Sequence, residues 1–546
     1  MSTPPSGSLP DRIAALPSWL LWLLLLSAVA LSHLTLLQLP YYWDEGGYYI
    51  PAALDFYHHG WLIPQFTNAH PPLPNILLGT LWHIVGLHIL ATRLFVCAVA
   101  AAALTAIFRL TQRLLDASAA IGVTLLTAVY PIWFAQSTLA HADIFAAAFT
   151  LWAFAFYLPA TSKPQNPRSD LSSSRIKVAI LFSLAALSKE TAIVEPAALI
   201  ALESFRLVRE RRSPRARQEH LRWIRALTIP FLPLIAWYAY HRARTGFTFG
   251  NPVYLRYNAT ANFTASHIFT ALRYRFVHLF WQRNIWLPIL LAVACLLLPR
   301  LPRSEIRPLT LSTRVTCAVL IAANWVAFSI LGGALLTRYL LPIYPLILLL
   351  CVDTWRERTP WIVWLTAASA AIFVSGLWIN PPTAFAPEDT LVYRDMILVH
   401  QQAIAFVNQH YPDATVLTAW PVSNDLFNPE LGYTTHRVQV TPLENFSFAE
   451  IQKAAQHPGD FDTAIIFTTH YVAPSLRRYL LSHPDSRIGR SVTANPDLSP
   501  AEIATILHGQ IVWRSPNLDG EWAVVLRFNR SYEARLTLLS SARLVP

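Results

Sequence analysis

Long apolar runs separated by short basic segments fill the first 380 residues. A helix that crosses a bilayer needs about 20 mostly apolar residues. Runs that approach this length predict about eleven membrane-spanning helices, at residues 17–39, 90–112, 118–137, 142–159, 174–190, 191–207, 224–240, 284–299, 312–332, 338–353 and 360–378. The pattern therefore predicts a mainly α-helical, polytopic membrane domain over residues 1–380.

Residues 72–90 are apolar too, but they begin in a proline-rich segment and contain His83 and His88. If this segment lies in the outer interface, the arginine clusters downstream all face the cytoplasm, as the positive-inside rule requires. If this segment spans the membrane, the orientation of every later segment is reversed and the same arginine clusters face outward. We therefore expect residues 72–90 to lie in the interface, with the N-terminus inside and the C-terminus outside.

The pattern changes after Ile379, where Pro381 and Pro382 mark a break. Residues 381–546 are more polar and predict a soluble α/β domain on the outer face. Two short apolar runs predict buried strands, residues 404–409 an amphipathic helix before the first of them, and residues 522–528 a late strand. The two runs are residues 414–420 and 461–468. A binding role for this domain, like that of a receptor, is one alternative.

Composition limits the class of protein further. The 546 residues are 54% hydrophobic and 13% charged, which is too apolar for a soluble enzyme. A net charge of +11 would suggest nucleic acid in a soluble protein. Here the arginines lie in short clusters between apolar runs, which is the orientation signal of membrane proteins, so no nucleic-acid partner is expected. The four cysteines lie within apolar runs and form no disulfide or zinc pattern.

The strongest chemical signal follows the first apolar run, where Asp44 and Glu45 lie among tyrosines and a tryptophan. Acids at the edge of a membrane are costly to keep, and aromatic side chains favour the headgroup region. This pattern predicts a catalytic first outer loop at residues 40–89. The alternative is that both acids cap a helix that begins at Gly46, since acids favour helix N-termini.

Three further charged residues lie at the ends of apolar runs. Asp143 begins one run, Lys189 ends another next to Glu190, and Arg338 precedes a late one beside Tyr339. A guanidinium matches a phosphate with two parallel hydrogen bonds, so Arg338 is a candidate phosphate ligand. The alternatives are an N-cap for Asp143, a structural Lys–Glu pair for Lys189 and an interfacial anchor for Arg338.

Other candidates lie in the predicted outer loops. His70 precedes Pro71 and Pro72, and we expect it to shape the loop over the site. Arg242, Arg244 and Arg256 lie in residues 241–283, where they can contact an anionic acceptor or lipid headgroups.

The order of these motifs resembles that of the GT-C membrane glycosyltransferases. The motifs are the acid pair after the first span, His-Pro-Pro-Leu at residues 70–73, Asp143, Lys189 and Thr-Arg-Tyr-Leu-Leu-Pro at residues 337–342. In pattern they are most similar to aminoarabinose transferases and protein O-mannosyltransferases. The resemblance covers roughly residues 15–380 and leaves out the C-terminal domain.

This resemblance implies transfer of a hexose or pentose from a polyprenyl-phosphate donor to a hydroxyl of a lipid, glycan or protein acceptor. The site would lie on the extracytoplasmic face of a bacterial inner membrane, in cell-envelope glycosylation. It implies that Asp44 is the base, with Glu45 and Asp143 also catalytic. His70, Lys189, Arg338 and Tyr339 would bind substrate.

The chemistry agrees with that assignment. Glycosyl transfer passes through an oxocarbenium-like state, and a sugar phosphate already has a good leaving group. The enzyme must supply a base for the acceptor hydroxyl and cations for the departing phosphate. Asp44 and Asp143 can also share a divalent cation or position the acceptor, so metal use stays open and no cofactor is certain.

Two rival functions remain. A ligase that moves a whole oligosaccharide would use the same kind of residues. A transporter or lipid flippase usually shows inverted repeats with ionisable groups near the midplane, whereas the charges here lie at span ends on one face, which favours an enzyme.

Overall fold

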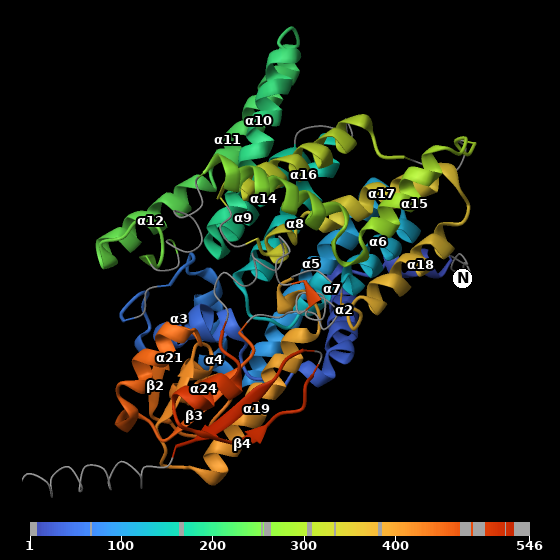
Figure 1. Ribbon diagram of the computed structural model, residues 1–546. Coiled ribbons are helices and arrows are strands. Elements are labelled where there is room, and N and C mark those ends of the chain that lie inside the picture. The colour runs from blue at the N-terminus through green and yellow to red at the C-terminus, as the bar shows by residue number, and fades with distance from the viewer. Residues whose placement is uncertain are drawn as a thin grey trace, which may run out of the picture. The chain divides into compact units, whose positions relative to one another are not determined.

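The computed structural model describes residues 8–65, 68–162, 169–252, 255, 264–302, 308–331, 335–380, 385–469, 482–483, 497–518 and 520–528. The chain divides into two units (Figure 1). The first comprises Met1–Gln38 and Tyr48–Ile379, and the second comprises Leu39–Gly47 and Asn380–Pro546. Each is described below by itself.

The first unit is helical throughout its described part. Its helices are α1 (Leu9–Ala14), α2 (Ser18–Ser32), η1 (Leu34–Leu36), α3 (Ile50–His59), α4 (Leu73–Val85), α5 (Ile89–Leu114), α6 (Ala117–Val129), α7 (Pro131–Gln136), α8 (Ala142–Ser162), α9 (Ser169–Ser188), η3 (Glu190–Ile193), α10 (Val194–Arg209), α11 (Pro214–Thr228), α12 (Phe231–Thr245), α14 (Ala265–Phe280), η5 (Gln282–Asn284), α15 (Trp286–Leu296), α16 (Leu311–Leu331), η6 (Thr337–Leu340), α17 (Tyr344–Arg358) and α18 (Ile362–Ser375).

Three helices of the described residues are long and apolar enough to cross a membrane: Ile89–Leu114, Ala142–Pro159 and Leu311–Leu331. A fourth span is present if Ala265–Asn284 and Trp286–Leu296, which meet at 92°, count as one. Several shorter helices are also apolar. This unit has the character of an integral membrane protein, while the expected eleven spans stay a prediction.

The centre of this unit is α8, which packs against both α5 and α9. Small buried side chains, including Ala100 and Ala103 on α5 and Ala153 on α8, line these helices. Small residues let helix backbones approach closely, which is how helices associate in an apolar solvent. The first turn of α8 is therefore held between neighbouring helices on several sides.

The structure corrects three of the expected elements. The run at residues 118–137 is divided into α6, which ends at Val129, and α7, which begins at Pro131. The run at residues 224–240 is not one helix, because α11 ends at Thr228 and α12 begins at Phe231. Pro230 is the N-cap of α12, and proline cannot continue a helix that requires its backbone N–H. The expected outer loop at residues 241–283 contains α14.

The interfacial segment is a short helix. Within residues 72–90 the structure places α4, which has 13 residues. That length rises about 20 Å, less than the roughly 30 Å of a hydrocarbon core. Because helices within expected spans, such as α6, have the same length, the position of α4 in the interface stays a prediction.

The second unit contains a five-stranded sheet in the order β2-β1-β3-β5-β4 (Figure 1). β1 pairs in parallel with β2 and β3, while β5 pairs antiparallel with β3 and β4. Its elements are η7 (Pro387–Asp389), α19 (Val392–His410), β1 (Val416–Ala419), α20 (Val422–Phe427), η8 (Pro429–Leu431), β2 (Val440–Leu443), α21 (Phe448–Ala455), η9 (Pro458–Asp460), β3 (Thr463–Phe467), α24 (Pro500–Ile506), β4 (Gln510–Arg514) and β5 (Ala523–Arg527).

The predicted strands and helix of this unit are confirmed. Every residue of β1 and of β3 is buried, as their unbroken apolar runs indicate. β2 and β4 were not predicted, because their residues are mostly part-exposed or exposed and carry no strong alternation. Their positions depend on partners elsewhere in the chain.

The acid loop, residues 39–47, packs on this C-terminal sheet unit. In the sequence, the 332 residues from 48 to 379 separate this loop from the rest of the unit. The Tyr41 backbone N–H donates to the Leu431 carbonyl at 3.0 Å. The Asn424 side chain donates to the Gly46 carbonyl at 2.8 Å. A Cβ on Gly47 would lie 3.1 Å from Cζ2 of Trp420, so glycine permits this close approach.

Candidate active site

Three charged side chains meet in the helical unit. Lys189 Nζ lies 2.6 Å from Asp143 Oδ1, and Arg338 Nε lies 3.4 Å from Asp143 Oδ2. Each of the three residues is about 3% exposed. We call these residues the charge centre. Lys189 and Arg338 therefore share one buried carboxylate.

Local backbone structure places each member. Asp143 lies in the first turn of α8, where the helix dipole favours an acid. It is the second helical residue and its carboxylate pairs with cations, so it does not act as a simple N-cap. Lys189 follows the end of α9 in extended backbone, with φ −149° and ψ 126°. Arg338 lies in η6, just before Pro342 and α17.

His141 borders the charge centre and was not among the sequence candidates. Its Nδ1 lies 2.9 Å from Gln136 Oε1 and 3.4 Å from Arg338 Nη1. Burial, together with the charges of Arg338 and Lys189, lowers the pKa of His141 well below its usual value. A neutral ring adds no further positive charge beside the two cations.

A second pair lies beside the first. His70 Nδ1 lies 2.9 Å from the Glu190 carboxylate. The Tyr49 ring stacks on His70 at 5.6 Å between centroids and lies 5.6 Å from His141. Lys189 therefore pairs with Asp143, and its sequence neighbour Glu190 pairs with His70. The adjacent Lys–Glu pair considered from the sequence is not what forms.

Tyr339 joins the cations. Lys189 Nζ lies 3.8 Å from the centroid of its ring, and the guanidinium carbons of Arg275 and Arg338 lie 5.5 and 6.0 Å away. Such contacts stabilise cations in a site that has little water. Arg275 is fully buried and was missed, because residues 241–283 were taken for a loop. The apolar spacing of residues 265–280 is the signal that would have placed it on a helix.

A small cavity opens beside the charge centre. Its volume is about 20 Å³. Asp143, Lys189 and Arg338 line one part of it, and Thr150 and Glu195 another. This volume accommodates one group the size of a water molecule.

The two acids of the acid loop differ in environment. Glu45 is fully buried, and its Oε2 accepts the Tyr42 backbone N–H at 2.8 Å, which holds the turn before the π-helix η2 (Glu45–Tyr49). That contact supports the helix-start alternative for Glu45. Asp44 is part-exposed. Asp44 belongs to the second unit and Asp143 to the first, so a cation shared between them stays a prediction.

No group of three or more His, Cys, Asp or Glu side chains gathers as a metal site within the described residues. The charge centre itself offers one carboxylate and two cations. Such a set suits an anion better than a divalent cation, whose ligands are oxygens.

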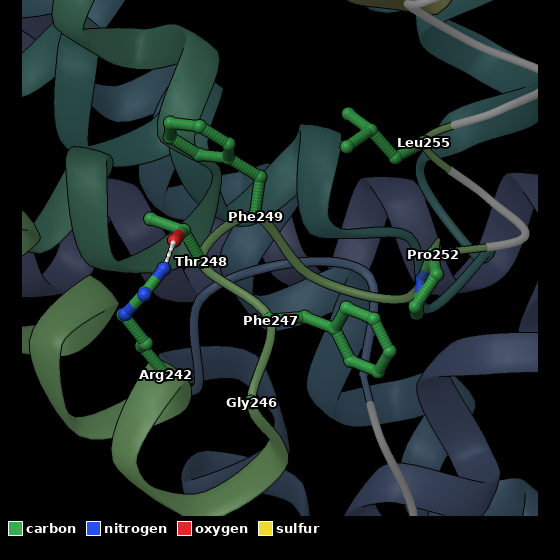
Figure 2. A pocket seen from close by; sticks show the side chains of 7 residues that line it. All are labelled: Arg242, Gly246, Phe247, Thr248, Phe249, Pro252 and Leu255. Carbon is green, nitrogen blue, oxygen red and sulfur yellow. Dashed lines mark hydrogen bonds between the residues drawn. The ribbon is translucent and has the colours of Figure 1, made fainter.

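A larger hollow lies at the end of α12 (Figure 2). Its volume is about 390 Å³, and it is lined by Arg242, Gly246, Phe247, Thr248, Phe249, Pro252 and Leu255. Arg242 Nη1 donates to Thr248 Oγ1 at 3.1 Å. The Arg244 guanidinium lies 4.3 Å from the Trp61 ring centroid. Both arginines are thus in the last turn of a helix, and Arg256 lies outside the described residues.

Comparison with known proteins gives a family model and solved structures. Residues 69–237 match the family model of dolichyl-phosphate-mannose-protein mannosyltransferase. The crystal structure of ArnT from Cupriavidus metallidurans bound to undecaprenyl phosphate is 14% identical, covers 92% of this chain and 97% of its own, and has a TM-score of 0.55. The apo ArnT structure gives 14% identity, coverage of 93% and 98%, and the same TM-score of 0.55.

A third structure is less similar. The Archaeoglobus fulgidus oligosaccharyltransferase in complex with Zn and sulfate is 11% identical, with coverage of 81% and 67% and a TM-score of 0.43, too low to support an argument. No curated protein sequence matches this chain.

The ArnT likeness extends over nearly the whole of both chains, and the mannosyltransferase model covers α8, α9 and the loop with His70. The predicted resemblance is confirmed at the level of the fold: this chain has the fold of ArnT, and residues 69–237 match the mannosyltransferase family model.

Proposed function

We propose that this protein transfers a single sugar from a polyprenyl-phosphate donor to an acceptor hydroxyl on the extracytoplasmic face of a bacterial inner membrane. The observation that carries the proposal is the charge centre. Lys189 and Arg338 share the one carboxylate of Asp143 in a buried position. Two adjacent buried cations can bind the oxygens of a phosphate through charge-assisted hydrogen bonds.

The charge change during the reaction suits this centre. The donor's phosphate is a diester with one negative charge. When the bond between the anomeric carbon and the phosphate oxygen breaks, the departing polyprenyl phosphate gains a second charge. Cations already in place stabilise that increase more than they stabilise the bound donor, which lowers the barrier. The ArnT structure with undecaprenyl phosphate supports this choice of lipid.

The remaining residues have distinct roles in this proposal. Asp143 holds Lys189 and Arg338 in place and keeps both charged. Tyr339 stacks with the cations, and His70 fixes Glu190 beside them. Asp44 accepts the proton of the acceptor hydroxyl as the new glycosidic bond forms, while Glu45 shapes the acid loop.

Lipid analysis of a deletion strain tests the reaction. We expect it to accumulate a polyprenyl phosphate that carries one sugar, and the wild-type gene, but not the Asp44→Asn variant, should remove it. Accumulation of an oligosaccharide-linked lipid would instead identify an oligosaccharide ligase. Unchanged lipids would reject both transferases and favour a transporter.

Cysteine labelling tests the membrane face. In a cysteine-free background, cysteines introduced at Ser266 and Thr435 should react with an impermeant maleimide in intact cells, whereas one at Ser213 should not. All three positions are exposed. Labelling at Ser213 alone would show that the orientation is the reverse of the one proposed.

A further inference from the structure

Two buried polar side chains line the small cavity beside the charge centre and have no role in the mechanism above. Thr150 lies on α8 and is 1% exposed, and Glu195 lies on α10 and is 2% exposed. Both line the same cavity as Asp143, Lys189 and Arg338. They therefore lie where a bound substrate would be within reach.

Both side chains have an atom available for hydrogen bonding. Glu195 Oε2 and Thr150 Oγ1 are buried and have no hydrogen-bond partner among the described residues. Native proteins pair nearly all their buried polar atoms, and exceptions concentrate at functional sites. Two such atoms in one cavity point to a polar ligand group between them.

The walls of the cavity determine the size of that group. Ala146, Ala147 and Ala192 contribute only methyl groups and leave a volume of about 20 Å³. One oxygen-sized group fits there, and a whole sugar ring does not. The side chains determine its chemistry, because a hydroxyl can donate to Glu195 Oε2 and accept from Thr150 Oγ1 at once.

We propose that Glu195 and Thr150 bind one hydroxyl of the sugar that is transferred. This rests on the proposed function, in which Lys189 and Arg338 hold the donor's phosphate. The anomeric carbon is joined to that phosphate, so the hydroxyl on the neighbouring carbon is the substituent closest to the charge centre. A sugar that lacks this hydroxyl leaves both buried atoms unpaired, which makes the pair a determinant of sugar specificity.

Lipid binding to the full-length protein separates this role from phosphate binding. The probes are sugar-free undecaprenyl phosphate and a panel of undecaprenyl-phosphate monosaccharides, from which the one that binds wild type most tightly is used. Thr150→Val and Glu195→Leu remove the polar atoms with little change of volume. Thr150→Ser and Glu195→Gln are the matched controls that keep hydrogen-bonding groups.

We expect Thr150→Val and Glu195→Leu to weaken binding of the sugar-bearing lipid by about 10-fold, the effect of losing a hydrogen bond and leaving the buried sugar hydroxyl without that partner. Their affinity for sugar-free undecaprenyl phosphate should stay within about 2-fold of wild type, which also shows that the variants fold. The two controls should retain most of the affinity for both lipids.

Other outcomes overturn the inference in distinguishable ways. Equal weakening for both lipids would show a structural role for the pair. If the variants bind both lipids as tightly as wild type does, the cavity holds only water. The same conclusion follows if wild type binds the sugar-bearing and the sugar-free lipid equally well. If wild type binds neither lipid, the proposed function fails and this inference with it.

Discussion

The helical unit contains two buried ionic clusters that differ in how their charges are paired. One is the charge centre, where Lys189 and Arg338 share Asp143. The other surrounds Glu203 on α10, which is 1% exposed. Its Oε1 accepts from the Tyr157 hydroxyl at 2.7 Å and from Arg206 at 2.8 Å, and its Oε2 lies 2.6 Å from His220 Nδ1.

The Glu203 cluster is closed within the protein. Both carboxylate oxygens have donors, and Arg206 makes a further hydrogen bond to Thr316 at 2.8 Å. The charge centre opens onto a cavity that Thr150 and Glu195 also line. Buried charge alone therefore does not mark a site. The space beside the charges distinguishes a binding centre from a structural network.

The largest expected effect tests this comparison directly. The double substitution Lys189→Ala and Arg338→Ala should weaken binding of undecaprenyl phosphate by about 100-fold or more, because each charge-assisted contact contributes roughly 1.5–3 kcal/mol. Arg206→Ala removes a part-buried cation from the Glu203 cluster. This variant should lower the Tm but leave lipid affinity within about 2-fold of wild type, because the Glu203 cluster is a structural network.

Arg338→Lys guards against misfolding of the double variant. It keeps the charge but loses the planar fork, so we expect a smaller loss of affinity, about 10-fold. The comparison would be wrong if Arg206→Ala weakened lipid binding as much as the double variant does.

A second test extends the comparison to the acid loop. If Asp44 accepts the acceptor's proton, Asp44→Asn should lower turnover about 100-fold and leave binding of undecaprenyl phosphate unchanged. Steady-state transfer and lipid binding by the same preparation separate the two quantities. Near-normal turnover would remove Asp44 from the catalytic residues.

The smallest expected effect concerns a third buried pair, in the C-terminal sheet unit. His400 Nδ1 lies 3.8 Å from Asp425 Oδ2, too far for a good hydrogen bond. Burial lowers the pKa of His400 to about 3 and raises the pKa of Asp425 well above its usual value. Burial thus favours the neutral form of each side chain in the folded unit.

Because folding raises the pKa of Asp425, this group should lower stability as the pH rises above its ordinary pKa of about 3.9. Because folding lowers the pKa of His400, that group should raise stability as the pH rises toward its ordinary pKa of about 6.5. The two effects oppose each other, each by up to about 1.4 kcal/mol per pH unit. Asp425→Asn leaves only His400, and stability should then rise with pH through about 6.5. Hydrogen exchange of β3 at several pH values measures how the stability of the parent protein and of Asp425→Asn changes with pH. Equal slopes for the two proteins would contradict the assignment of these pKa shifts.

The sequence by itself determined the class of this protein and most of its candidate residues. Apolar runs near membrane length predicted a helical membrane domain, and fully apolar short runs predicted β1 and β3, because these signals are local periodicities. Asp143, Lys189 and Arg338 were found because each interrupts or borders an apolar run, where a charge is costly unless it is paired or used.

Only the tertiary structure decided how these residues combine. Lys189 pairs with Asp143, 46 residues away, instead of its neighbour Glu190. Arg275 on α14 lies against the Tyr339 ring that both cations contact. The acid loop packs on the C-terminal sheet unit. Local pattern cannot predict such pairings, because the partner of a buried charge is chosen by which helices pack together. That choice depends on side-chain fit across the whole unit.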